Sequence, residues 1–581
     1  MSNRFGVTVL AAIAAIASIS AQPSEATKQF QQLTAAETEY RRVTFPEEAT
    51  LESDHRFNTR WNDYSIRRRD PAVAHARQGL AQLAAIDPTR LSEQDALSHE
   101  LLRRQYALEI ESHRFPEDYL LIDQMRGRQL DTPEVLASMP RGTAADFETI
   151  LVRLDALPAV LKQWEALLRD GLSKGVTPPQ AAIGELPQQV LQQVTGADAL
   201  ATPIMAPFAS IPNTIDAESA KLLRQRAMAV FTQKVKPAYE SFHRFLADTY
   251  VPGARRTNGF TDLPDGAAWY ALELRRHTTT SLTTRELHDD AMRTIDQLVS
   301  EMQAVMKTVG FKGTVEGFRK HVEANQPPLA STADVLREYR DIAKRVDPLL
   351  PQYFRVLPRT PFGIEPIPAF RGAAVPYYQG PPPDGSRAAN FFVPADPKRN
   401  PRWRMVTYVL HEGVPGHHLE RALFAEERAI PGFRRSLEMT AYVEGWAMYA
   451  DHTLGQEMGF YNEPYARYGF LASRMISATG IAVDTGMNAL GWTRERAIEF
   501  LRTHRGGSEM EYAVNRVTAW PGQIMSYSVG ADVILRLRGE MKALRGDRFD
   551  IREFHDVVLR DGPMPLDLLE QRVKKYYAAT K

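Results

Sequence analysis

The stretch His411-Glu412-Gly413-Val414-Pro415-Gly416-His417-His418 follows a mostly apolar segment, residues 403–410. It places three imidazoles and a carboxylate within about two helical turns, a higher density than 14 histidines in 581 residues predict. Imidazoles and carboxylates commonly hold Zn²⁺ in proteins, and a further acidic group can activate water. The stretch therefore favours a helical fold in which a kinked helix carries a metal site.

The spacing of the histidines differs from the plain His-Glu-x-x-His pattern, because Pro415 stands four residues after His411. In a regular helix His418 shares a face with His411, but a rise of about 10 Å over seven residues makes a shared metal hard. Pro415 and the glycines beside it predict a bulge that brings His417 to the second ligand position. His418 stays open as the alternative. Whichever of the two does not bind metal is expected to support a ligand or contact substrate.

Two glutamates are candidates for the acidic roles. Glu412 directly follows the first histidine, and on a helix it would lie beside the metal, which suits a general base. Glu444 stands in the otherwise apolar run 440–447, where a buried charge needs a partner or a metal. Glu438 is closer in the sequence. The apolar surroundings and Gly445, which permits close backbone approach, favour Glu444 as the third ligand.

Three further residues are candidates for supporting roles. Asp451, about two turns after Glu444, could orient a ligand histidine, although a solvated helix surface is the commoner place for an Asp. Tyr527 follows a Pro-Gly turn, and its hydroxyl could donate to the oxyanion of a tetrahedral intermediate. Arg516 could bind a substrate carboxylate. Taken alone, such a Tyr or Arg is more often structural.

Composition limits the classes of function. Lys+Arg and Asp+Glu both number 71, and this zero net charge argues against nucleic acid as a partner. A content of 44% hydrophobic and 24% charged residues is typical of a soluble globular protein. The sequence has no cysteine, which excludes disulfides, catalytic thiols and Cys-ligated zinc. A metal would have to be held by histidines and carboxylates.

The N-terminus has the pattern of a secretory signal. Arg4 precedes the apolar residues 7–19, and small residues then favour cleavage after Ala21. This apolar run is too short to span a membrane comfortably, and no other segment approaches that length. The absence of cysteine excludes a lipid anchor on the signal. We therefore expect residues 1–21 to be a signal peptide, no stable membrane span after cleavage, and a secreted or periplasmic protein.

Apolar residues at three- and four-residue spacing predict helices through most of the chain. In the N-terminal half, residues 22–350, the expected helices include 70–86, 92–112, 144–171, 215–250, 284–309 and 331–346. In the C-terminal half, residues 403–581, they include 441–455, 467–490, 493–503, 510–520 and 523–544.

Residues 351–402 are rich in proline and contain β-like runs at 364–368 and 390–393. The aromatic residues among them favour a small layer of sheet and loops beside the site over a linker. An exposed edge strand there could bind an extended peptide by backbone pairing.

Several blocks in order resemble the bacterial DUF885 proteins, a family placed with the gluzincin-like zinc metallopeptidases. The similar blocks are residues 411–419, 444–449, 483–486, 491–495 and 521–523 with Ser526, Tyr527 and Gly530, then 384–387 and, more weakly, 553–555. The resemblance is dense from about residue 351 to the C-terminus and only general before it.

The resemblance implies a mostly α-helical, large zinc-peptidase-like architecture with a central cleft between two halves. It implies His411, His417 and Glu444 as zinc ligands and Glu412 as the catalytic acid and base. The related peptidases have a plain His-Glu-x-Gly-His, and Gly416-His417 would be its last pair displaced by two residues. This favours His417 over His418. Other divalent ions also accept such ligands.

The leading interpretation is a secreted zinc-dependent hydrolase, a metallopeptidase acting on short peptides by metal-activated water. Glu412 would act as general base and Tyr527 would contact the oxyanion. The alternative is a non-catalytic peptide- or metal-binding protein on a peptidase scaffold. A zinc amidase or esterase is a third interpretation that the residues do not separate from the first.

Overall fold

The computed structural model describes residues 24–579 except 126, 372–374, 383–384, 386 and 507–509. The expected signal peptide, residues 1–21, lies outside these residues. Helices dominate the described chain, and a three-stranded sheet accompanies them, which confirms the mostly helical class with a small β layer. Of the helices in the described part, none is both long and apolar enough to cross a membrane.

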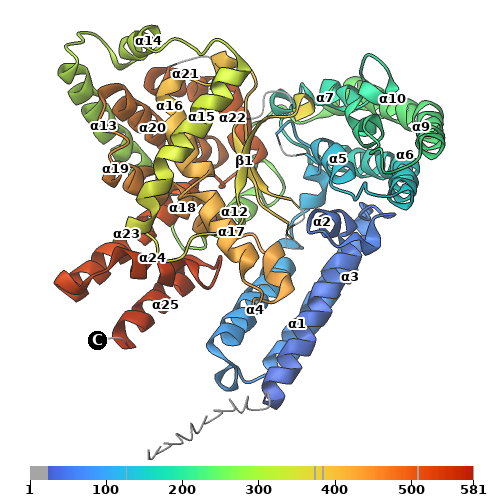
Figure 1. Cartoon of the computed structure of the whole chain (residues 1–581), viewed down its shortest axis with the longest axis horizontal. Helices are drawn as coiled ribbons and strands as arrows, with labels where there is room; N and C mark the ends of the chain where they lie inside the picture. The colour runs from blue at the N-terminus through green and yellow to red at the C-terminus, as the bar shows by residue number, and fades with distance from the viewer. Residues whose placement is uncertain are drawn as a thin grey trace, which may run out of the picture.

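The first helices form a bundle at one end of the molecule, where α3 packs along α4 (Figure 1). Helix α4 begins where the Ser92 hydroxyl accepts a hydrogen bond from the Asp95 backbone N–H, which satisfies one of the unpaired amides of a helix start. The bounds are α1 (Glu25–Thr44), α2 (Pro46–Leu51), α3 (Arg69–Ala84) and α4 (Glu93–Ser112).

A helical lobe with its own apolar core follows. Its longest helix begins with a capping box between Thr143 and Asp146, and buries Trp164 against Phe242 of a later helix. The bounds are α5 (Arg128–Ala137), α6 (Ala144–Ser173), α7 (Leu186–Gln192), α8 (Ala206–Ala209), α9 (Ala217–Val230), α10 (Lys236–Phe245) and α11 (Val251–Gly253). Short π-helical turns, Phe231–Val235 and Leu246–Tyr250, join α9, α10 and α11 into a nearly continuous rod over the expected helix 215–250.

The C-terminal helices form the main body together with helices that precede residue 350 (Figure 1). Helix α13 lies along α20, and both contribute to one large apolar core. The bounds of the earlier helices are α12 (Gly266–Thr278), α13 (Thr284–Thr308), α14 (Val315–Asn325) and α15 (Thr332–Val346). The later ones are α16 (Arg402–Glu412), α17 (His417–Glu426), α18 (Thr440–Met448), α19 (Gly455–Glu457), α20 (Pro464–Ala489), α21 (Arg494–Arg505), α22 (Met510–Ala519), α23 (Met525–Arg545), α24 (Ile551–Leu559) and α25 (Leu566–Ala579).

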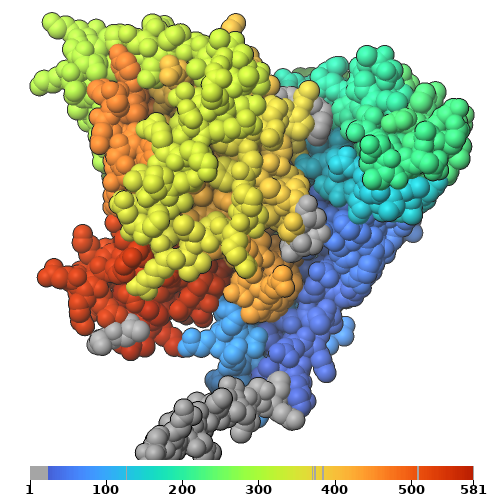
Figure 2. All heavy atoms as spheres, viewed as in Figure 1, coloured from blue at the N-terminus to red at the C-terminus, as the bar shows by residue number. Residues whose placement is uncertain are grey.

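The proline-rich segment forms a mixed sheet with the strand order β1-β3-β2. Strand β1 (Phe362–Pro366) runs parallel to β3 (Ala389–Val393), and β2 (Tyr377–Gln379) is antiparallel to β3 at the edge. Phe391 of β3 packs edge-on against Tyr339 of α15, so the sheet is part of the folded body. Figure 2 shows this segment beside the lobe, where the lobe meets the main body.

Candidate metal centre

The histidine-rich stretch is a break between two helices. Helix α16 ends at Glu412 and α17 begins at His417, with a cis Val414–Pro415 peptide bond in the connection. The expected bulge inside a continuous helix is therefore wrong: Gly413 is no longer helical, and the His418 N–H reaches back five residues to the Gly413 carbonyl. Pro415 has no N–H with which to continue the helical ladder.

Gly416 lets the start of α17 lie directly on the end of α16. A Cβ at this position would be 2.0 Å from the carbonyl oxygen of His411 and 2.4 Å from that of Leu410. The Trp446 indole N–H of α18 donates to the Pro415 carbonyl at 3.0 Å, which ties the same connection to the helix that carries Glu444. These contacts turn the imidazole of His417 back toward His411.

The structure brings His411, His417 and Glu444 together. The two imidazole rings lie 4.7 Å apart at 81° to each other, and Glu444 Oε2 is 3.5 Å from Nε2 of each. One potential ligand atom from each residue lies within 4.8 Å of the other two. The break between α16 and α17 thus brings His411 and His417 together, which the spacing of a regular helix would not allow.

These distances fit a divalent cation. Tetrahedral ligands about 2.0–2.2 Å from Zn²⁺ are about 3.4 Å from one another, close to the two 3.5 Å separations here. Glu444 Oε2 is buried and has no hydrogen-bond partner among the described residues, as 3.5 Å is long for a hydrogen bond. A buried carboxylate oxygen without a partner is costly unless a cation satisfies it.

Asp451 orients the first histidine. Its Oδ2 accepts a hydrogen bond of 3.1 Å from His411 Nδ1, which directs Nε2 toward Glu444. Glu444 and Asp451 lie on one rod, because a π-helical turn, Tyr449–Leu454, joins α18 to α19. Carboxylates that fix the tautomer of a ligand histidine are common around metals.

Without a metal ion, a protonated His411 balances the negative charge of Glu444. Burial lowers the pKa of His411, but Asp451 and Glu444 outweigh this effect and hold the pKa well above its usual value. Burial raises the pKa of Glu444, yet the two imidazoles beside it hold that pKa well below its usual range. Burial also lowers the pKa of His417, which favours a neutral imidazole, the form that binds metal.

Glu444 is held from its other side by Gln523, which follows the Pro-Gly turn before α23. The Gln523 side-chain amide donates to Glu444 Oε1 at 3.3 Å and accepts from the guanidinium of Arg516. Arg516 thus acts on Glu444 through Gln523. The guanidinium also lies 5.9 Å from the ring of Tyr527.

Glu412 and Tyr527 face a cavity of about 470 Å³ beside the centre. We call it the metal cavity. It lies between the lobe, which contributes Glu185 and Gln189, and the main body. The ring of Tyr527 stacks on His411 at 5.8 Å. The cavity is thus lined by residues from both parts of the chain.

Glu412 and Tyr527 both have raised pKa values. Burial is the main cause that raises the pKa of Glu412 to about 8, and Glu444 and Asp451 add to it while His411 opposes it. Burial also raises the pKa of Tyr527, so its hydroxyl keeps its proton and can donate.

His418 points away from the cluster and supports the sheet. Its Nε2–H donates to the Thr360 carbonyl at 3.0 Å, and its Nδ1 accepts from the Tyr378 hydroxyl at 3.1 Å. Burial lowers its pKa to about 4, consistent with a neutral ring that uses both nitrogens. His417 is thus the histidine that lies with His411 and Glu444, whereas His418 hydrogen-bonds to Thr360 and Tyr378.

The sequence alone did not single out Glu420 and His452 as residues of this region, nor did it predict that Gln523 would support Glu444. Glu420, one turn after His417, is 2% exposed, and burial raises its pKa to about 7. Neither of its carboxylate oxygens has a hydrogen-bond partner in the described chain. His452 follows Asp451 and lies beside it at 3.5 Å. Glu420 could have been noticed in the sequence, because it is a carboxylate on the apolar face of α17. No sequence feature distinguishes His452.

Comparison with known proteins yields a family and a fold. A model of bacterial proteins of unknown function, DUF885, matches residues 46–573, and no curated protein matches the chain. The crystal structure of a protein from Colwellia psychrerythraea, described as a "putative lipoprotein", has a TM-score of 0.88 at 24% identity. The match covers 95% of this chain and 99% of that one.

A structure from Shewanella oneidensis, with the same description and unknown function, has a TM-score of 0.70 at 17% identity. This match covers 93% of the present chain and 99% of the Shewanella chain. At these identities the two structures show a shared fold. The family match spans most of the chain, and the chain therefore belongs to the DUF885 family of bacterial proteins.

Proposed function

We propose that this protein is a zinc-dependent hydrolase that cleaves short peptides, related to the helical zinc metallopeptidases. One observation carries the proposal: two imidazoles stand 3.5 Å from a buried carboxylate oxygen that has no hydrogen-bond partner in the described chain, at the wall of a cavity. His411, His417 and Glu444 would hold the ion. A bound Zn²⁺ supplies Lewis acidity and lowers the pKa of water.

The side chains around the cavity supply the remaining roles. Glu412 takes a proton from the attacking water and passes it to the leaving amine. Its pKa of about 8 refers to the metal-free site, and a nearby divalent cation favours the carboxylate form. Tyr527 donates its hydroxyl hydrogen to the oxyanion that develops on the scissile carbonyl. Asp451 accepts a hydrogen bond from His411 Nδ1, and Nε2 of that ring would then be free to bind the ion.

Strand β2 offers a way to position an extended peptide. It is one of the two edge strands of the sheet, and Tyr377 and Tyr378 line the metal cavity together with Glu412. Backbone groups on an edge strand can pair with a peptide and present it in one register. The substrate would then lie between the sheet and the lobe, with its scissile bond beside Glu412.

We also propose that the protein works outside the cytoplasm. The N-terminal signal pattern and the description of both structural relatives as lipoproteins support this location. The 581 residues contain no cysteine that could carry a lipid.

The competing function is peptide or metal binding without turnover on the same scaffold. Purified protein is supplied with Zn²⁺ and incubated with a mixed peptide pool, and cleavage is followed by mass spectrometry. We expect hydrolysis that Glu412→Gln abolishes without reducing metal content. The matched control is Glu438→Gln, because Glu438 is exposed and outside the cavity. Absence of hydrolysis in the wild-type protein with metal bound would favour the binding function.

A further inference from the structure

Three cavities adjoin one another along α16. The metal cavity shares Glu412 and Tyr527 with a second cavity of about 220 Å³, which we call the middle cavity. The middle cavity shares Arg404 and Tyr408 with a third of about 240 Å³, the basic cavity. Val375 and Pro376 line all three cavities, and His411 lines the metal and middle cavities, so the three adjoin one another beside the proposed metal ligands.

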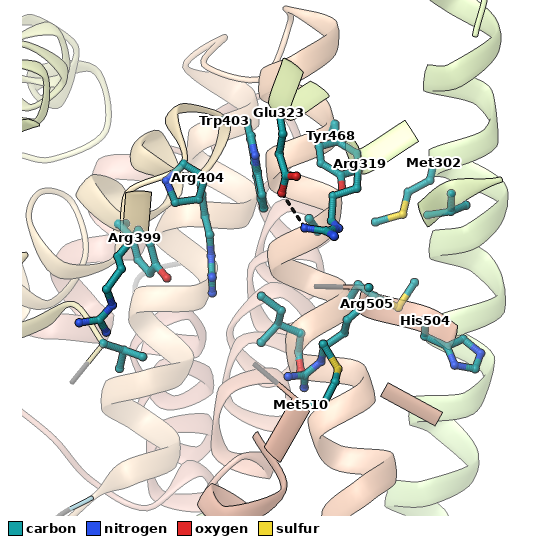
Figure 3. Close-up of a pocket in the computed structure, with 18 of the residues that line it drawn as sticks. Met302, Arg319, Glu323, Arg399, Trp403, Arg404, Tyr468, His504, Arg505 and Met510 are labelled. Atoms are coloured by element: carbon teal, nitrogen blue, oxygen red, sulfur yellow. Dashed lines mark hydrogen bonds and ion pairs between the residues drawn. The ribbon is translucent and has the colours of Figure 1, made fainter. Parts of the chain in front are cut away.

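The basic cavity carries a strong excess of positive charge. Of its described lining residues only Glu323 is acidic, and that carboxylate pairs with Arg319, as the dashed line in Figure 3 shows. Its cationic side chains are Arg319, Lys398, Arg399, Arg404 and Arg505. Such a wall attracts an anionic group.

Arg404 is a partly buried member of this group. In the part of the chain that the structure describes, its guanidinium has no carboxylate partner, and its buried Nε has no hydrogen-bond partner. Its guanidinium carbon lies 4.7 Å from the centre of the Tyr408 ring. Figure 3 shows Arg404 extending from α16 into the cavity. A half-buried guanidinium without a carboxylate partner can bind the planar carboxylate of a ligand through two parallel hydrogen bonds.

The position of Arg404 relative to the proposed metal site is fixed by a single helix. Arg404, Thr407, Tyr408, His411 and Glu412 follow the spacing i, i+3, i+4, i+7, i+8 of one helix face, and all five line the middle cavity. The seven residues from Arg404 to His411 correspond to about 10 Å along the axis. An extended peptide covers this distance with about three residues.

The wall between the two ends is mostly apolar. Met448, Ile476, Val517 and Ile524 line the middle cavity, which therefore suits the uncharged part of a peptide. We propose that Arg404 binds the C-terminal carboxylate of the substrate, so that cleavage falls two or three residues before the C-terminus. This inference rests on the proposed hydrolase function and assigns its substrate class: short peptides with a free C-terminus.

The test measures binding without turnover, in full-length protein carrying Glu412→Gln. The probes are three labelled alanine tetrapeptides: one with a free C-terminal carboxylate, one with a C-terminal carboxamide, and one carboxamide peptide whose last residue is glutamate. Fluorescence anisotropy gives each Kd. We expect the free acid to bind about tenfold tighter than the plain carboxamide, or more, as charge-assisted hydrogen bonds contribute on this scale.

Adding Arg404→Met should reduce that ratio to about one. The matched control is Arg402→Met, because Arg402 begins the same helix, is exposed and does not line the three cavities. Thermal unfolding verifies that each variant folds. Should Arg404→Met fail to fold, Arg404→Lys keeps the charge without the planar fork and is expected to give an intermediate ratio.

Equal affinities for acid and carboxamide, a ratio that survives Arg404→Met, or no binding of any probe would each overturn the inference. Tight binding of the glutamate carboxamide would show a side-chain carboxylate as the ligand and overturn the C-terminal assignment. Hydrolysis of the same peptides by the wild-type protein is measured separately. Cleavage of acid and carboxamide at equal rates would leave the hydrolase function standing while the role of Arg404 fails.

Discussion

Gly445 of α18 and Gly530 of α23 touch backbone to backbone. A Cβ on Gly445 would lie 2.4 Å from the Cα of Gly530, and a Cβ on Gly530 would lie 1.8 Å from the Ala441 carbonyl oxygen. This contact brings α18, which carries Glu444, close to the start of α23, which carries Tyr527. The geometry of the candidate centre therefore depends on two residues without side chains.

Gly530→Ala should destabilise the protein and disturb the centre. The added methyl group has no space, and overpacking of this kind costs about 1–3 kcal/mol. Urea unfolding followed by circular dichroism measures the change. The control is Gly539→Ala on the same helix, where a Cβ meets nothing within 4 Å. This control should be stabilising by about 0.4–1 kcal/mol. Equal effects of the two substitutions would contradict the close approach.

His417 and His418 should differ in what they support. We expect His417→Ala to lose bound zinc, because its Nε2 faces Glu444 Oε2 at 3.5 Å. His418→Ala should keep the zinc and lower the free energy of unfolding, since it removes hydrogen bonds to Thr360 and Tyr378. Metal content after reconstitution and dialysis is measured by elemental analysis. Zinc loss in His418→Ala with retention in His417→Ala would reverse the assignment.

Gln523→Ala should weaken zinc binding while the ligands remain. Its amide holds Glu444 Oε1, and removal of such an orienting hydrogen bond typically costs about 10–100-fold in metal affinity. Competition with a zinc chelator measures the affinity. Gln456→Ala is the control, because that exposed amide donates to a helix carbonyl, that of His452. An unchanged zinc affinity in Gln523→Ala would show that Glu444 needs no support from this side.

Local sequence signals predicted the helices well because the chain supplies both periodicity and caps. The expected helix 284–309 matches α13, whose start is fixed by a capping box between Thr283 and Glu286. The β-like runs at 364–368 and 390–393 overlap β1 and β3. Strand β2 has three residues, too few for an alternating pattern, and it was not expected.

The candidate ligand set could be argued from the sequence, but its geometry could not. The helix break depends on the contact of Gly416 with the end of α16, which no local spacing rule encodes. The link between Gln523 and Glu444 joins residues 79 positions apart, and such a pairing leaves no periodic trace. The cavity that Arg404 lines likewise requires the packing of α16 against elements from across the chain.

Acid should destabilise the protein through its buried neutral histidines, and His555 is the clearest case. Its Nδ1–H donates to the Tyr353 carbonyl and its Nε2 accepts from the Tyr449 hydroxyl, both at 2.8 Å. Burial lowers its pKa to about 3. In the unfolded chain its pKa is about 6.5, so only the unfolded state takes up a proton between these values. The stabilising contribution is therefore present above pH 6.5 and is lost as the pH falls toward 3.

The wild-type protein should lose about 2 kcal/mol of its free energy of unfolding between pH 7 and pH 5 through His555 alone. His555→Gln should be less stable at pH 7, because it leaves one of the two buried partners unsatisfied, but it lacks this pH dependence. The two stability curves should then converge as the pH falls. Urea unfolding of both proteins at pH 7, 6 and 5 measures the difference. Parallel curves would mean that His555 is already protonated in the folded protein or that it titrates alike in both states.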